Sequence, residues 1–321
     1  MGKIALLESL MHHHLIESYL LNQKVCMDLF KFARGQSFPA GTLYLVPTPI
    51  GNLADITIRA LHILSQVDGI ACEDKRHSAM LLNAYGISKP LYALHEHNEI
   101  SASAYLLEKL RNGERWAYIS DAGTPGISDP GAILCEEIKK GGCQICPLPG
   151  PSAITAAVSG AGDFLKHGNG GFQFLGFLPA KANQRDELLK VAATSNISSF
   201  FYEAPHRIES TLNSILVHLD GERKVLIAKE LSKIFEEIKV ITVQDLPDWM
   251  KTVESWQGEY VLGIEGVARS DSPSSFDEHT LQWISAINGR IGHKELSEII
   301  SQITGISKKD AYRELIEKKE E

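Results

Sequence analysis

Three short segments rich in glycine, proline, serine and aspartate carry the residues best suited to hold a small ligand. They are residues 47–53 (PTPIGNL), 120–131 (SDAGTPGISDPG) and 149–153 (PGPSA). Glycine lets a ligand approach the backbone closely, and proline stiffens a loop so that less order has to be created on binding. Each segment follows an apolar run typical of a β-strand, and in open α/β sheets ligands bind beyond the carboxyl ends of the strands. We therefore expect a ligand site at these loops; the alternative is that they only turn the chain.

A charged cluster at residues 73–77 (EDKRH) follows another apolar run. Glu73 and Asp74 are candidates for a general base, because a positioned carboxylate can accept a proton. Arg76 can hold a phosphate group, with His77 beside it. The alternative is that these charges pair only with one another.

Several familiar cofactor and metal signatures are missing. The nearest approach to G-x-G-x-x-G is at 168–173, where glutamine takes the place of the last glycine, and there is no G-x-x-x-x-G-K-[ST]. Cys143 and Cys146 would face opposite sides of a strand, so we interpret them as structural thiols. His95 and His97 share a face of an extended chain, but no third ligand is evident. We expect no metal site.

The composition bounds the remaining possibilities. The chain has 321 residues, 44% hydrophobic and 22% charged, which predicts a folded protein of two domains. A formal net charge of −8 argues against binding to nucleic acid through bulk charge. Five cysteines form no disulfide framework, and neither a signal peptide nor an apolar run long enough to span a membrane is present. A cytoplasmic protein is expected.

The hydrophobic pattern alternates between strands and helices. In the first half, strands are expected at 42–46, 69–72, 116–120 and 144–148, and helices at 55–66, 103–112 and 132–140. In the second half, strands are expected at 172–176, 199–202, 224–228 and 259–264, and helices at 153–159, 183–193 and 207–219. The alternation in the first half is typical of a mostly parallel sheet covered by helices.

Stretches rich in glycine, proline and serine divide the chain into four segments. The rigid run Pro147-Leu148-Pro149-Gly150-Pro151 predicts a boundary between α/β domains at 41–149 and 150–268. A helical extension is expected at 1–40, with its helix from Ile4 to Arg34, and a helical tail at 276–321. In the tail we expect helices at 294–304 and 308–318, with Ser307 and Asp310 as a capping pair at the start of the second helix. Its seven basic and nine acidic residues favour a packing element over a direct reader of RNA.

Seven motifs in their order and spacing resemble one family. The chain contains TPIGNLADIT, CEDKRHS, HEHNE, SDAGTPGISDPG, PLPGPSA, FLGFLP and FYEAPHRI. Together they resemble the bacterial ribosomal RNA small-subunit methyltransferase I family, which belongs to the tetrapyrrole-methylase-like, or class III, S-adenosylmethionine methyltransferases. The resemblance runs over residues 41–266. Pro47 stands where the family usually has alanine, Lys75 where it has threonine, and residues 160–171 are longer and richer in glycine than usual.

The resemblance implies a fold, a cofactor and a reaction. It implies two α/β domains of the tetrapyrrole-methylase type, with S-adenosylmethionine in the cleft between them, in a homodimer. The implied reaction is 2′-O-methylation of a cytidine ribose in the decoding region of 16S rRNA, free or in the 30S subunit. The cofactor residues carried over by motif are Pro49, Ile50, Asp121, Gly123, Thr124, Ile127, Ser128, Ser152, Ala153, Tyr202 and Ala228. The candidate catalytic residues are Glu73, Asp74, Arg76 and His77, with His206 and Arg207 assisting.

Two alternatives remain open. The first is another enzyme of the same fold, acting on a tetrapyrrole or on a different RNA, which would share the cofactor loops but not CEDKRHS or FYEAPHR. The second is a ribosome-binding module without catalysis. Among the charged residues we expect the cluster at 73–77 to serve the RNA and not the cofactor.

Overall fold

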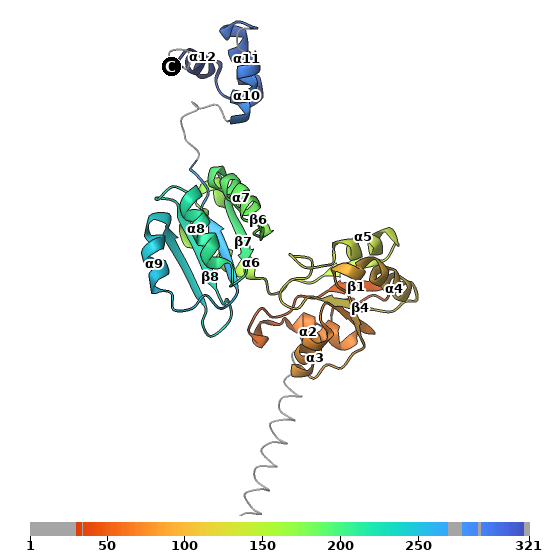
Figure 1. Ribbon diagram of the computed structural model, residues 1–321. Coiled ribbons are helices and arrows are strands. Elements are labelled where there is room, and N and C mark those ends of the chain that lie inside the picture. The colour runs from red at the N-terminus through yellow and green to blue at the C-terminus, as the bar shows by residue number, and fades with distance from the viewer. Residues whose placement is uncertain (1–29, 34, 269–277, 288–289, 318–321) are drawn as a thin grey trace, which may run out of the picture. The chain divides into compact units, whose positions relative to one another are not determined.

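The computed structural model describes residues 30–33, 35–268, 278–287 and 290–317, which fall into two compact units divided after Val267 (Figure 1). Of the predicted N-terminal extension, residues 1–29 lie outside the described residues, and Phe30–Phe32 form a 3₁₀ turn. The boundary predicted at 149–150 falls between a strand of one sheet and the helix that follows it, and stays a prediction. No helix among the described residues is long and apolar enough to cross a membrane.

The first sheet is parallel throughout, with strand order β3-β2-β4-β1-β5. Its strands are β1 (Thr42–Leu45), β2 (Gly69–Cys72), β3 (Leu91–Ala93), β4 (Trp116–Ile119) and β5 (Gln144–Pro147). Its helices are α2 (Ile58–Gln66), α3 (Lys75–Ala84), α4 (Glu99–Arg111) and α5 (Ala132–Lys140). Helix α2 begins three residues later than predicted, because the Thr57 side chain caps it by accepting a hydrogen bond from the amide of Ala60.

Alternate strand residues supply the two faces of this sheet, as the period of two requires. Tyr44 and Ile70 pack with helices α2 and α3, whereas Leu43 and Ala71 pack with α4 and α5. Figure 1 shows the two helix pairs on either side of the strands. Because both faces are covered, the carboxyl ends of the strands are left to carry a site.

The second sheet is mixed, with strand order β6-β7-β10-β8-β9; only β6 and β7 are parallel. Its strands are β6 (Phe172–Phe177), β7 (Ser198–Glu203), β8 (Lys224–Lys229), β9 (Glu237–Thr242) and β10 (Tyr260–Ile264). Its helices are α6 (Ala153–Ser159), α7 (Ala182–Thr194), α8 (Ile208–His218) and α9 (Leu246–Thr252). Helices α7, α8 and α9 pack on one face, and α6 packs on the other with Phe164.

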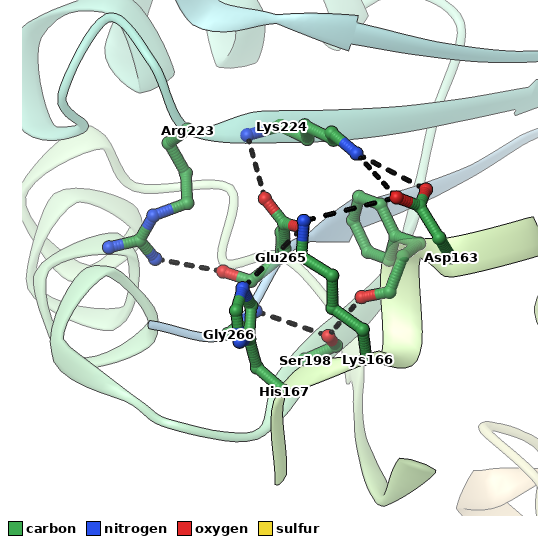
Figure 2. Close-up of polar contacts among 9 residues, drawn as sticks. Asp163, Lys166, His167, Ser198, Arg223, Lys224, Glu265 and Gly266 are labelled. Atoms are coloured by element: carbon green, nitrogen blue, oxygen red, sulfur yellow. Dashed lines mark hydrogen bonds and ion pairs between the residues drawn. The ribbon is translucent and has the colours of Figure 1, made fainter. Parts of the chain in front are cut away.

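The glycine-rich segment at 160–171 folds into two 3₁₀ turns, Gly162–Leu165 and His167–Gly170. Phe164 is fully buried, and its carbonyl accepts a hydrogen bond from Ser198 Oγ. Figure 2 shows the polar network that this segment forms at the far end of β10, where Glu265 accepts a hydrogen bond from the amide of Lys224. Lys166 Nζ lies 3.5 Å from Glu265 Oε1. This segment therefore packs where β7 and β8 begin and β10 ends.

The second unit contains helices α10 (Glu278–Ile287), α11 (His293–Thr304) and α12 (Lys308–Glu317). Their core is formed by Ile284, Leu296, Ile300, Ala311 and Leu315. Helix α11 ends at Gly305, whose φ of 75° is left-handed, and the predicted capping pair forms, since the amide of Asp310 donates to Ser307 Oγ at 3.2 Å. The two predicted helices of the tail are confirmed.

Candidate functional site

A cavity of about 450 Å³ lies at the carboxyl ends of β2 and β4, and residues around β6, β7 and β10 line it as well. Most residues that the sequence predicts for a cofactor line it: Ile50, Asp121, Gly123, Thr124, Ile127, Ser128, Ser152, Ala153 and Tyr202. Pro49 and Ala228 are not part of the lining. Ala228 is fully buried in the core on the α6 face of the second sheet.

Hydrogen bonds tie the three predicted loops to one another. Thr48 and Gly123 exchange two backbone hydrogen bonds of 2.9 and 3.0 Å. The Thr124 hydroxyl donates to the carbonyl of Pro151 at 2.9 Å. Gly123 has a left-handed φ of 82°, and a Cβ atom there would lie 3.4 Å from Ile50 Cγ2. The loops thus form one rigid wall in which glycine is required.

Two buried side chains hold the end of the 120–131 loop. The Tyr118 hydroxyl donates to the carbonyl of Pro130 at 2.7 Å. Glu99, 6% exposed, accepts hydrogen bonds from the amides of Gly131 and Leu134 at the start of α5. The last residue of HEHNE is therefore a structural anchor of the loop, and its Asn98 accepts a hydrogen bond from the amide of His95. Among the described residues, no group of three or more His, Cys, Asp and Glu side chains could hold a metal ion.

The wall of the cavity that follows the strands of the first sheet is acidic. Glu73, Asp121 and Asp129 all line it. Burial, and then the charge of Asp121, raises the pKa of Glu73, while His95 opposes this shift. Burial, followed by the charges of Glu73 and Asp121, raises the pKa of Asp129 to about 6. Asp129 is not among the predicted residues; the available signal is the second aspartate of SDAGTPGISDPG.

The predicted catalytic cluster divides between the cavity and helix α3. Glu73 lines the cavity, but Asp74, Arg76 and His77 do not. Asp74 is the N-cap of α3, where its Oδ1 accepts hydrogen bonds from the amides of Arg76 at 2.7 Å and His77 at 3.3 Å. These two hydrogen bonds lower the pKa of Asp74. Glu73 is therefore the stronger proton acceptor of the two.

The opposite wall comes from the second sheet. Tyr202 lies between two aromatic neighbours, with ring centroids 4.7 Å from Phe174 and 5.3 Å from Phe177. Glu203 is buried and accepts hydrogen bonds from the amide of Ala204 and the hydroxyl of Thr211. It also pairs with Arg207 at 2.6 Å, so the acid and the arginine of FYEAPHR fix the loop that lines the cavity.

The chain is similar to known proteins over most of its length. The family model of the tetrapyrrole (corrin/porphyrin) methylases matches residues 42–247. The chain is 40% identical to the ribosomal RNA small subunit methyltransferase I of Haemophilus influenzae over 274 residues, 85% of this chain and 95% of that protein. It is 39% identical to the protein of the same name from Pseudomonas aeruginosa over 280 residues, 87% of this chain and 98% of that one.

Solved structures share the fold. The methyltransferase CobJ superposes with a TM-score of 0.53 at 20% identity, covering 73% of this chain and 98% of that one. Cobalt precorrin-4 methyltransferase CbiF gives 0.51 at 19% identity, covering 71% and 98%. At this level of sequence identity the structural similarity shows the fold alone, and it confirms the predicted fold class. The chain therefore belongs to the tetrapyrrole methylase family, among the relatives named ribosomal RNA small subunit methyltransferase I.

Proposed function

We propose that the protein transfers a methyl group from S-adenosylmethionine to the 2′-oxygen of a cytidine ribose in the decoding region of 16S rRNA. The observation that carries the proposal is the 40% identity, over 85% of the chain, to a protein named for methylation of small-subunit ribosomal RNA. The site supports it, because six of the seven motifs contribute residues to the lining of one cavity.

The residues of the cavity fit the proposed cofactor. S-adenosylmethionine carries a positive sulfonium, and the carboxylate of Asp121 lines the wall that would receive it. The left-handed Gly123 lets a ligand approach the backbone of the first wall. The aromatic ring of Tyr202 offers a flat surface on the second wall. When bound, the cofactor supplies an activated methyl group, so that the protein has to supply position and charge.

The proposed work of the protein is to align a ribose hydroxyl and accept its proton. Good alignment of the 2′-oxygen can contribute an effective molarity of roughly 10⁵–10⁸ M. We assign the proton to Glu73, which lines the cavity and whose pKa is raised by burial. Asp74 would have an indirect role, because it caps α3 and so holds the start of that helix in place. Arg76 and His77 lie outside the cavity lining and would hold RNA phosphates.

The proposed partner is small-subunit rRNA or the 30S subunit, and we propose a homodimer in the cytoplasm. Sedimentation that shows only monomer at tens of micromolar protein would contradict the dimer.

The alternative substrate is a tetrapyrrole, as the name of the family model suggests. No observation in the structure favours a tetrapyrrole over RNA.

The test of the proposed function begins with binding of S-adenosylmethionine, expected in the micromolar range without added metal. The protein is then incubated with cofactor labelled on the methyl group, in one reaction with small ribosomal subunits and in another with uroporphyrinogen. Label in the RNA alone supports the proposal. Label in the tetrapyrrole supports the alternative enzyme, and absence of cofactor binding supports a module without catalysis.

A further inference from the structure

Strand β6 is interrupted by a bulge beside the cavity. Phe174 pairs with Phe200 and Phe177 pairs with Tyr202, so β6 has one more residue than β7 between the two pairs. Gly176, within the bulge, has a left-handed φ of 72°. Bulges beside sites change the direction of a side chain. Here the bulge brings Phe177 into the lining of the cavity.

Phe177 is a fixed but half-exposed ring. It contacts Tyr202 in an edge-to-face arrangement, with ring centroids 5.3 Å apart and planes at 65°, yet 54% of the residue is exposed. The exposed part of the ring belongs to the cavity wall, where a ligand can reach it. An aromatic face in such a position is the kind of surface on which proteins stack unpaired bases.

Asp129 comes to the same part of the cavity through Ser128. Ser128 has a left-handed φ of 64°, a conformation that costs energy in a residue with a side chain. Its Oγ lies 3.5 Å from the position that a Cβ atom of Gly176 would occupy. The 120–131 loop therefore lies against the bulge of β6. Asp129 follows Ser128, Phe177 follows Gly176, and both line the cavity.

We propose that Phe177 and Asp129 form a subsite for a cytosine base, in which the ring stacks on the base and the carboxylate accepts a hydrogen bond from its exocyclic amino group. The proposal rests on the proposed function and names how the target nucleotide is selected. Cytosine presents an N4 amino donor, whereas uracil presents an acceptor, O4, at the same position. An ionised carboxylate accepts only, so it favours cytosine and repels uracil.

The charge state of Asp129 supports this selection. Its pKa is raised to about 6 by burial, and then by Glu73 at the end of β2 and Asp121 at the end of β4, while Ser120 opposes the shift through a hydrogen bond. Tyr118 and Tyr202 are the other titrating groups that interact with it. The carboxylate is thus ionised at neutral pH and accepts a proton as the pH falls through about 6. A protonated Asp129 could donate to O4 of uracil, so the preference for cytosine should weaken in that range.

The stacking is tested with Phe177→Leu, which removes the aromatic face, and Phe177→Trp, which restores one. Phe172→Leu is the matched control, because Phe172 lies on the same strand, is 41% exposed and does not line the cavity. The measurements are S-adenosylmethionine affinity by calorimetry and the concentration of small ribosomal subunits that half-saturates methyl transfer. We expect Phe177→Leu to raise that concentration about tenfold, as loss of one stacked base would, with unchanged cofactor affinity, and Phe177→Trp to restore it. An unchanged half-saturation, or a weakened cofactor affinity, overturns the stacking.

The carboxylate is tested with Asp129→Asn, whose amide can both accept and donate. Transfer is measured on subunits carrying cytidine or uridine at the mapped position, at pH 7.5 and at pH 5.5. We expect the wild-type protein to prefer cytidine at pH 7.5 and less so at pH 5.5, and the variant to have a smaller preference that does not change with pH. Equal preferences in both proteins overturn the role of Asp129. If the wild-type protein methylates neither RNA, the proposed function fails, which is a result distinct from either of these.

Discussion

The Glu99 carboxylate accepts a hydrogen bond from the amide of Gly131 at 2.9 Å, across 32 positions of sequence. A second hydrogen bond, from the amide of Leu134 at 3.0 Å, goes to the same oxygen. Glu99 lies at the start of α4 and Gly131 at the start of α5, so one buried acid joins two helices and fixes the end of the loop that carries Asp129. Precise placement of the cavity wall depends on a residue that does not line the cavity.

Replacement of Glu99 by alanine should therefore destabilise the protein. Two buried amides would lose their acceptor, at a cost of about 2–4 kcal/mol in the free energy of unfolding. Glu99→Gln keeps an acceptor oxygen and should cost less. Urea unfolding of both variants checks this, with Glu96→Ala as the control, since Glu96 belongs to the same motif but is exposed. Equal losses for Glu99→Ala and Glu96→Ala would show that the anchor does not matter.

Gly123→Val should weaken the binding of S-adenosylmethionine by tenfold or more. The valine would have to adopt a φ of 82°, and its side chain would extend toward Ile50 in the cavity wall. Gly142→Val is the control for backbone strain, because Gly142 has a φ of 78° but no atom within 4 Å of a Cβ position, and it does not line the cavity. Calorimetric binding to folded variants is the measurement. Undiminished affinity in Gly123→Val would remove the cofactor from this cavity.

Asp129→Asn should stabilise the protein at neutral pH. The folded-state pKa of about 6 lies above the ordinary value of 3.8, so the favourable contribution of the protonated acid is present below pH 4 and is lost as the pH rises through 6. Asparagine does not titrate. With a discount for partial exposure, we expect a gain of about 1 kcal/mol in unfolding free energy at pH 7.5 that vanishes near pH 4. A gain of the same size at both pH values would contradict the raised pKa.

Arg76→Ala should weaken the binding of small-subunit RNA without affecting the cofactor. Arg76 follows the N-cap of α3 and does not line the cavity. Loss of one phosphate contact should reduce the slope of log affinity against log salt by about one. Filter binding over a range of salt concentrations measures the slope, and calorimetry measures the cofactor. A folded variant that no longer binds S-adenosylmethionine would place Arg76 in the cofactor site instead.

The pattern of the sequence predicts those parts of the fold that are decided locally. The bounds of α5 and α6 agree with the predicted ranges 132–140 and 153–159, since Gly131, Ser152 and Gly160 stand beside their ends. The parallel first sheet follows from alternating buried strands and amphipathic helices. The pattern did not predict β9, because it is an edge strand in which no residue is fully buried.

The composition of the loops predicts where the candidate site lies, but it does not predict every side chain that lines the cavity. The glycine- and proline-rich loops led to most of the cavity wall. Glu73 lines the cavity whereas Asp74 caps a helix, because β2 ends at Cys72 and α3 is capped at Asp74. A shift of one residue in either element would change which acid lines the cavity. The positions of Phe177 and Asp129 depend on a register shift between β6 and β7 and on the approach of Ser128 to Gly176. Such contacts between distant segments leave no periodic signal in the sequence.

The most direct test of the central claim is to locate the transferred methyl group. Small ribosomal subunits methylated by the purified protein are digested to nucleosides and to oligonucleotides, and both are examined by mass spectrometry. The proposed function predicts one 2′-O-methylcytidine in the decoding region of 16S rRNA, formed only with S-adenosylmethionine present. A methyl group on a base, on a ribose outside that region, or no methyl group in the RNA at all would contradict it.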